Sequence, residues 1–181
     1  MRKLVLKMDC SLDGFVGGPN GQLDWLIPDF DEEHTDWLVG KLWQAGAHLM
    51  GSATYRGMAA HWPTSTEPYA APMNQIPKIV FSRSLKQTNW GDARIATGDL
   101  ATEVTRLKQE TGKALLAHGG ARFAQALIGS GLIDEYWLII HPIALGTGLR
   151  LFPEIPAPIR LKLLSETTFK TGVMATVFQR A

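Results

Sequence analysis

Short apolar segments alternate with longer amphipathic segments along most of the chain, and this order limits the folds open to it. Short apolar runs are typical of buried strands, and the segments between them have the apolar spacing of helices. Strands are expected at residues 3–8, 47–51, 78–82, 93–97, 114–117 and 134–141, and helices at residues 31–46, 52–60, 99–112 and 118–130. Strands joined by helices pair in parallel, with helices on both faces of the sheet. The sequence therefore predicts an α/β fold with a mostly parallel central sheet.

Two further segments complete this prediction. Residues 159–179 alternate apolar and polar side chains around a Lys170-Thr171-Gly172 turn, which predicts a C-terminal antiparallel hairpin. Residues 63–77 are polar and contain prolines, and we expect a loop there. A chain of 181 residues with 45% hydrophobic content has the size and the apolar content of one domain, residues 1–181.

The composition excludes several classes of partner. Lys and Arg total 18 and Asp and Glu total 17, and the resulting net charge of +1 argues against a nucleic-acid partner and a polybasic membrane anchor. No segment reaches the ~20 apolar residues of a membrane span, and Lys7 and Asp9 interrupt the run that a signal peptide needs. Cys10 is the one cysteine, so no internal disulfide forms, and we expect a small buried residue there. These features predict a cytoplasmic protein, and they leave a small-molecule substrate open.

Three of the predicted strands are followed directly by residues that suit a phosphate group. The segment Gly51-Ser52-Ala53-Thr54 begins one helix, and His118-Gly119-Gly120 precedes another. Glycines allow close approach of the main chain, and a helix N-terminus offers unpaired N–H groups to an anion. Ser82-Arg83 follows a third strand, and a guanidinium beside hydroxyls suits a phosphate monoester.

Each of these junctions also has a simpler interpretation. Residues 51–54 could be an ordinary helix cap, residues 118–120 a tight turn, and Arg83 a solvated surface residue. Together they carry more weight, because α/β sheets bind ligands outside the carboxyl ends of their strands. The spacing alone predicts a phosphate-bearing ligand, and it does not match the GxGxxG pattern of a Rossmann fold.

Carboxylates near the first strand are the candidate catalytic groups. Asp9 is preferred, because it lies at a strand end where partial burial would raise its pKa; capping of a loop is the alternative. Asp13 is expected to form a turn, and Asp29 and Asp31 are expected to cap a helix. The five histidines have no metal-ligand spacing, so no metal site is expected, although His118 could contact a phosphate or simply pack.

Five stretches of the sequence resemble the dihydrofolate reductase superfamily, and more closely its riboflavin-biosynthesis branch, the RibD C-terminal domain. They are SLDGFVGGPNGQLDW (residues 11–25), LMGSATY (49–55), KIVFSRSL (78–85), HGGARFAQALIGSGLIDE (118–135) and HPIALGTGLRLF (141–152). They occur in the order found in that family and cover nearly the whole chain. The last two are more similar to the riboflavin-type branch than to dihydrofolate reductase itself.

The resemblance implies a three-layer α/β/α fold, a homodimer, and NADPH that passes a hydride to a heterocyclic or sugar-derived substrate. Asp9 and Trp25 would contact the substrate, and Arg150, after the glycine-rich loop, is a candidate for binding a substrate phosphate. The cofactor-binding residues would be Val16, Gly17, Gly51, Ser52, Ala53, Thr54, Ser82, Arg83, His118, Gly119, Gly120, Ala121, Arg122 and Phe123.

Two departures from the family pattern bear on the ligands. Ser52 stands where relatives commonly carry arginine, which leaves Arg83, with Arg56 as a second candidate, to bind the 2′-phosphate of NADPH. Phe30, flanked by Asp29 and Asp31, stands where dihydrofolate reductases place the carboxylate that binds the pterin, which argues against folate.

The best substrate prediction is 5-amino-6-(5-phosphoribosylamino)uracil, reduced at its ribosyl carbonyl. One alternative is a reductase of another pteridine-like substrate, and the other is a non-catalytic nucleotide-binding or regulatory module on the same scaffold.

Overall fold

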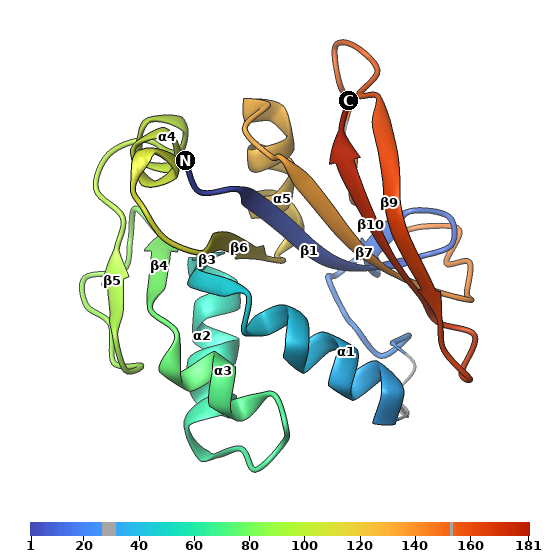
Figure 1. The fold of residues 1–181 in the computed structure, drawn as a ribbon, viewed down its shortest axis with the longest axis horizontal. Coiled ribbons are helices and arrows are strands. Elements are labelled where there is room, and N and C mark those ends of the chain that lie inside the picture. Colours follow the sequence, from blue (N-terminus) through green and yellow to red (C-terminus); the bar gives the residue numbers. More distant parts are fainter. Residues whose placement is uncertain (27–31, 153) are drawn as a thin grey trace.

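An eight-stranded sheet forms the centre of the molecule, in the order β5-β4-β3-β6-β1-β7-β10-β9 (Figure 1). The computed structural model describes residues 1–26, 32–152 and 154–181. The strands are β1 (Leu4–Ser11), β3 (Ala45–Gly51), β4 (Lys78–Phe81), β5 (Ala93–Ile95), β6 (Ala114–His118), β7 (Glu135–His141), β9 (Leu161–Thr168) and β10 (Met174–Arg180). The strands from β5 to β7 in this order are all parallel, and β10 pairs antiparallel with both β7 and β9. The predicted parallel sheet with a C-terminal antiparallel hairpin is confirmed.

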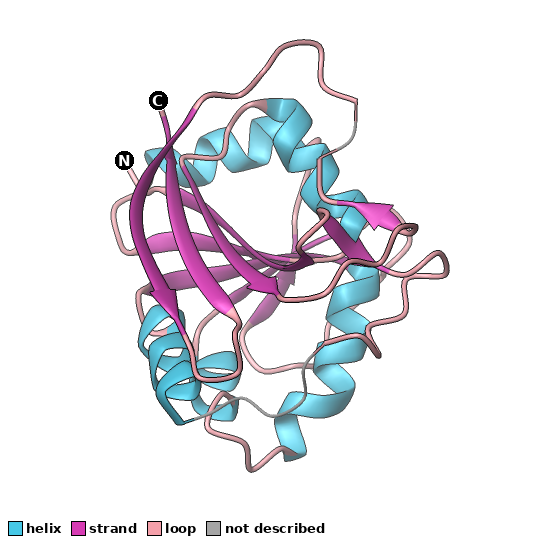
Figure 2. Cartoon of the chain, turned by 90° about the vertical axis from the view of Figure 1, so that its right-hand side faces the viewer, coloured by secondary structure: helices cyan, strands magenta, loops and turns pink. Residues whose placement is uncertain are grey.

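Helices cover both faces of the sheet (Figure 2). Side chains alternate along a strand, so Leu6 of β1 packs toward α4 (Leu100–Gln109) and α5 (Ala121–Ser130), whereas Val5 packs on the opposite side. That opposite face is covered by α1 (Glu32–Leu42), α2 (Ser52–His61) and α3 (Ala70–Gln75). Asp99 caps α4 as predicted, accepting a hydrogen bond from the N–H of Thr102. None of the helices described is long and apolar enough to cross a bilayer.

The helix α3 lies in the segment predicted as a loop, and that part of the prediction is wrong. Ala70, Pro72 and Met73 are buried against the sheet, so tertiary packing supports a helix that the local sequence does not indicate. Pro72 is compatible with it because the proline stands in the first turn, where its missing N–H would have no partner in the helix. A single 3₁₀ turn, residues 62–64, precedes it.

A small second sheet joins two loops near the carboxyl end of β1. The strand β2 (Phe15–Gly17) pairs antiparallel with β8 (Leu149–Arg150). A Cβ atom on Gly148 would lie well inside contact distance of the Gly17 carbonyl oxygen, so only glycine allows this approach. Asp13 ties the same loops together, accepting hydrogen bonds from the N–H groups of Leu145 (3.0 Å) and Gly146 (2.7 Å).

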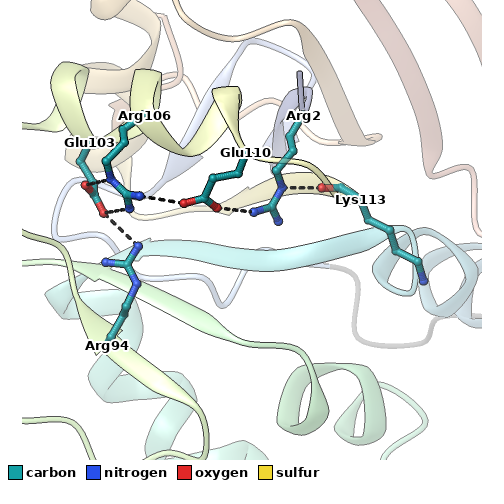
Figure 3. A network of polar contacts seen from close by, with 6 residues as sticks. All are labelled: Arg2, Arg94, Glu103, Arg106, Glu110 and Lys113. Carbon is teal, nitrogen blue, oxygen red and sulfur yellow. Dashed lines mark hydrogen bonds and ion pairs between the residues drawn. The ribbon is translucent and has the colours of Figure 1, made fainter.

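A chain of ion pairs fastens α4 to its neighbours (Figure 3). Glu103 contacts Arg94 of β5 at 2.9 Å and Arg106 at 3.0 Å, and Arg106 contacts Glu110 at 2.7 Å. Glu110 then pairs with Arg2, before β1, at 3.3 Å, and the Arg2 Nε donates to the carbonyl of Lys113, before β6. We call this set the α4 ion-pair chain. It links α4 to β5 and to the segments that precede β1 and β6.

Cys10 lies on the side of β1 that faces α4 and α5, in the same cluster as Leu4, Leu6 and Met8. Burial, helped by the charge of Asp9, raises the pKa of its thiol to about 12. The expectation of a small buried residue is met, and the thiol stays protonated.

Candidate functional site

The three predicted phosphate-binding junctions lie side by side along the edge of the sheet where the parallel strands have their carboxyl ends. They follow β4, β3 and β6, which are neighbouring parallel strands. The Phe123 ring at the start of α5 lies 5.4 Å from the Phe81 ring at the end of β4. A Cβ atom on Gly51, at the end of β3, would lie 3.3 Å from the Cβ of Phe123. The junctions are therefore contiguous, as the sequence predicts.

A cavity of about 520 Å³ opens at this edge, between β1, β6, α2 and the loop that follows β2. Its size falls in the range of small-molecule sites. The lining residues are Lys7, Met8, Asp9, Val16, Gly21, Leu23, Leu26, Ala53, Thr54, Gly57, Met58, His118, Gly119, Gly120, Ala121 and Leu149. Most of this wall is apolar, and its polar groups come from β1, α2 and the junction after β6.

Paired glycines form the part of the wall where the main chain comes closest to its surroundings. A Cβ atom on Gly119 would lie 2.8 Å from the Met8 sulfur, and one on Gly120 would lie 2.8 Å from the Thr54 hydroxyl. Gly120 also has a φ of +106°, which side-chain-bearing residues rarely adopt. The Thr54 hydroxyl donates to the carbonyl of Gly119 and so joins the two junctions.

The N-termini of α2 and α5 both lie at this cavity, whose wall includes Ala53 and Thr54 of α2 and Ala121 of α5. Gly51 and Gly120 are the N-cap residues, and neither helix has a side-chain hydrogen bond at its cap. The first-turn N–H groups of a helix have no partner within the helix and attract anions. Two uncapped N-termini beside one cavity fit a diphosphate group.

A second cavity of about 260 Å³ lies beyond β4. Ser82, Arg83, Gly98 and Asp99 line it, together with apolar neighbours. The Ser82 oxygen accepts hydrogen bonds from two backbone N–H groups, at 3.2 and 3.0 Å, which leaves its own hydrogen available to donate. Arg83 supplies the positive charge of this cavity, and the Asp99 carboxylate, which caps α4, adds a negative charge to its wall.

Asp9 is held between two basic side chains. Its carboxylate lies 2.6 Å from Lys7 Nζ and 3.3 Å from His141 Nε2. Burial raises the pKa of Asp9, but the charge of Lys7 and the hydrogen bonds from His141 and Lys7 outweigh burial and bring the pKa well below its usual range. The raised pKa expected from the sequence is therefore wrong, because Lys7 and His141 contact the carboxylate. At neutral pH, Asp9 is ionised.

The structure separates the predicted site residues into groups. Eight of them line the main cavity: Asp9, Val16, Ala53, Thr54, His118, Gly119, Gly120 and Ala121. Ser82 and Arg83 line the second cavity, whereas Gly51 and Phe123 pack between the two. Gly17, Ser52 and Arg122 are not among the residues lining either cavity. Phe30, Asp29 and Asp31 lie outside the described residues.

The two other predicted substrate contacts lie beside the main cavity and not in its wall. Trp25 packs edge-on against His141 at 5.5 Å between ring centroids, and His141 in turn contacts Asp9. Arg150 lies in β8 with its guanidinium 5.3 Å from the centre of the Phe15 ring. It therefore does not supply a cation to the cavity in this arrangement.

Lys7 is a residue of the cavity wall that the sequence interpretation does not include among the site residues. Its side chain is only 14% exposed and lines the cavity next to Asp9. The signal is present in the sequence: residues two apart in a strand face the same side, so a lysine two positions before a strand-end aspartate predicts an ion pair.

Within the described part of the chain, no cluster of three or more His, Cys, Asp or Glu is placed to hold a metal ion.

These features define a three-layer α/β protein of the dihydrofolate reductase-like class, with its cavity at the carboxyl ends of a mainly parallel sheet. A dihydrofolate reductase from Enterococcus faecalis, solved with NADP(H) and RAB-propyl, shares the fold with a TM-score of 0.65 at 16% identity, over 98% of this chain and 96% of that one. Within this class, the chain belongs to the RibD C-terminal domain family, whose model matches residues 2–175.

Two further proteins are similar to this chain over nearly its whole length. Uncharacterized protein YyaP of Bacillus subtilis (strain 168) is 32% identical over 182 residues, covering 98% of this chain and 94% of that protein. A diaminohydroxyphosphoribosylaminopyrimidine deaminase/5-amino-6-(5-phosphoribosylamino)uracil reductase from Thermotoga maritima superposes with a TM-score of 0.69 at 15% identity, over 99% of this chain and 57% of that one. The family resemblance predicted from the sequence is confirmed.

Proposed function

We propose that the chain is an NADPH-dependent reductase that transfers a hydride to a small heterocyclic substrate. The observation that carries this proposal is the meeting of the Gly51, Ser82 and Gly119 junctions at one sheet edge, beside a cavity with a Lys7–Asp9 ion pair. The NADP(H) held by the Enterococcus faecalis neighbour and the reductase name of the Thermotoga maritima neighbour support it.

The residues at the junctions fit the phosphates of such a cofactor. Gly119 and Gly120 have no room for a side chain against Met8 and Thr54 and so leave bare main chain in the cavity wall, and the N-termini of α2 and α5 would bind the diphosphate. Arg83 and the Ser82 hydroxyl would bind the 2′-phosphate in the second cavity. Bound in this way, NADPH would supply the hydride.

The proton that accompanies hydride transfer is assigned to Lys7 Nζ. An ammonium group has three donors, and Asp9 accepts one of them, so the others remain for the cavity. Asp9 is ionised and therefore orients Lys7 instead of donating a proton itself. A substrate bound against the apolar wall would displace water from around this pair and strengthen its field.

The cavity favours an uncharged heterocycle over the phosphoribosyl substrate predicted from the resemblance. Lys7 is the one cation among the described residues of its wall, and Asp9 neutralises it. Arg150, the candidate for a substrate phosphate, lies over Phe15 instead. Reduction of 5-amino-6-(5-phosphoribosylamino)uracil stays a candidate, and reduction of another pteridine-like heterocycle is the second candidate that this wall supports.

Cofactor binding is the first test of the proposed function. NADPH is expected to raise the melting temperature more than NADH does, because a ligand that binds only the folded state stabilises it. Arg83→Ala should remove that preference, about tenfold in affinity, while Arg160→Ala, at an exposed site outside the junctions, should leave it unchanged. No shift with either nucleotide would contradict the cofactor assignment, and an unchanged preference in Arg83→Ala would contradict the role of Arg83.

Turnover separates a reductase from a non-catalytic nucleotide-binding module. NADPH oxidation would be followed with a panel of pteridines, pyrimidines and ribosyl phosphates. Binding of NADPH without oxidation by any of them would favour the module. The homodimer implied by the resemblance stays a prediction, and sedimentation equilibrium of the full chain tests it.

A further inference from the structure

Two buried histidines from neighbouring strands form a hydrogen-bonded pair behind the cavity. His118 Nε2 lies 2.8 Å from His48 Nδ1, and His48 Nε2 lies 3.2 Å from the carbonyl oxygen of Pro72. His48 is fully buried and His118 is 4% exposed. His118 ends β6 and lines the cavity, whereas His48 lies in β3 behind it. We call His48 and His118 the histidine pair.

The contacts of the histidine pair fix which ring nitrogens carry hydrogen. A carbonyl oxygen only accepts, so His48 Nε2 must donate to Pro72. In a neutral ring the other nitrogen is then an acceptor, so His48 Nδ1 accepts and His118 Nε2 donates. The remaining nitrogen, His118 Nδ1, is left without hydrogen. No hydrogen bond to it is formed by the residues that the structure describes.

Both rings are neutral, because their surroundings oppose a positive charge. Burial, helped by the nearby charge of Lys78 and opposed by the hydrogen bond to the Pro72 carbonyl, lowers the pKa of His48 to about 4. Burial also lowers the pKa of His118 well below its ordinary value, helped by His48 and by Lys7, against the opposing charge of Asp9. The arrangement of hydrogens therefore holds throughout the neutral range.

We propose that His118, oriented by His48, is a hydrogen-bond acceptor that selects a ligand carrying an amide-type N–H donor. His118 lines the cavity and its Nε2 is taken by His48 behind it, so Nδ1 is the ring nitrogen that remains for a ligand. Lys7, the register partner of His118 on β1, offers only donors, so the two side chains together match a ligand edge with one donor and one acceptor. That edge is an amide or a lactam, as in the carboxamide of nicotinamide or the N–H and C=O of a pteridine.

The hydrogen placement can be measured without any ligand. The ¹⁵N shifts of the His118 ring distinguish a protonated from an unprotonated nitrogen. The expected spectrum has a protonated Nε2 and an unprotonated Nδ1 at neutral pH. His48→Leu should produce a mixture of the two tautomers, because the partner that fixes the ring is removed. A wild-type spectrum with the hydrogen on Nδ1 would overturn the proposal.

Two pairs of ligands identify the source of the donor. One pair is NADPH and its 3-acetylpyridine analogue, in which a methyl group replaces the amide NH₂ and the carbonyl remains. The other pair is lumazine and 1,3-dimethyllumazine, measured with NADPH present. In the wild type, the ligand that contacts His118 should bind about fivefold more tightly than its donor-free partner, which is the value of one neutral hydrogen bond.

His118→Phe should abolish that preference in one of the two pairs, and the affected pair names the source. His48→Leu, which keeps the acceptor but frees the ring, should reduce the preference only partly, and it provides a second variant if His118→Phe does not fold. If neither preference depends on His118, the proposal is wrong. The measurement with NADPH and its analogue rests on the proposed function, which fails if NADPH does not bind. In that case the tautomer of His118 and the two lumazines, measured without NADPH, still decide this proposal.

Discussion

The charged side chains of the protein form two sets that differ in where their partners lie. In the α4 ion-pair chain, Glu103 and Glu110 each contact two guanidinium groups, and hydrogen bonds from Arg106 and Arg94 keep the pKa of Glu103 low against its burial. At the carboxyl end of β1, Lys7 and Asp9 pair with each other but line a cavity. Charged groups that are paired with one another away from any cavity stabilise the fold. Charged groups that keep hydrogen-bond donors facing a cavity can also act on a ligand.

Replacing Lys7 should have the largest effect, and mainly on turnover. Lys7→Met is expected to lower kcat by about 10²- to 10⁴-fold, which is the usual contribution of a positioned proton donor, with cofactor affinity little changed. Lys3→Met is the matched control, because Lys3 also forms an ion pair, with Glu135 at 2.6 Å, but is 60% exposed and outside the cavity. Steady-state kinetics checks both, and equal losses would remove Lys7 as the proton source.

Adding a methyl group at Gly120 should damage the site and the fold together. Gly120→Ala places a Cβ 2.8 Å from the Thr54 hydroxyl at a φ of +106°, so we expect a loss of about 1–3 kcal/mol of stability and weaker NADPH binding. Gly129→Ala, in the same helix with nothing within 4 Å of the new atom, should be neutral or stabilise slightly. Urea unfolding and titration with NADPH measure these effects, and equal behaviour of the two variants would contradict the close approach.

Opening the α4 ion-pair chain should cost stability without affecting the site. Glu103→Gln removes the charge that holds Arg94 and Arg106, but both guanidinium groups stay about half exposed and can be solvated. The expected loss is about 1–2 kcal/mol in the free energy of unfolding. NADPH affinity should be unchanged, and a loss of affinity would show that the two charged sets are coupled.

Acid should release the contact that Asp13 makes with the glycine-rich loop. Its hydrogen bonds from Ser11, Gly146 and Leu145 lower the pKa of Asp13 to about 2, so the carboxylate stabilises the folded state above its ordinary pKa of about 3.9 and loses this effect as the pH falls toward 2. The stability difference between wild type and Asp13→Asn should therefore be present at neutral pH and vanish between about pH 4 and pH 2. Urea unfolding at several pH values checks it; a constant difference would contradict the assignment.

The sequence predicts the parallel sheet and the C-terminal hairpin because their apolar patterns extend over many residues. It predicts the Asp99 cap because aspartate directly before a helical pattern is a local signal. It fails at α3, where Met73 is buried by tertiary contacts, and at β2 and β8, which are too short for a periodic pattern. The sequence also predicts that the junctions at Gly51, Ser82 and Gly119 lie together, because the carboxyl ends of parallel strands lie at the same edge of a sheet. His48 and His118 are 70 positions apart, and only the register of β3 on β6 brings them together.

The burial of Cys10 has a practical consequence for experiments on this protein. Only a thiolate reacts readily with maleimides, iodoacetamide or peroxide, and a buried thiol with a pKa near 12 is almost never in that form. Because the chain has no other cysteine, the native protein carries no reactive thiol. A cysteine introduced at the rim of the cavity would therefore accept a spectroscopic label at one position, so that ligand entry could be followed without a cysteine-free background.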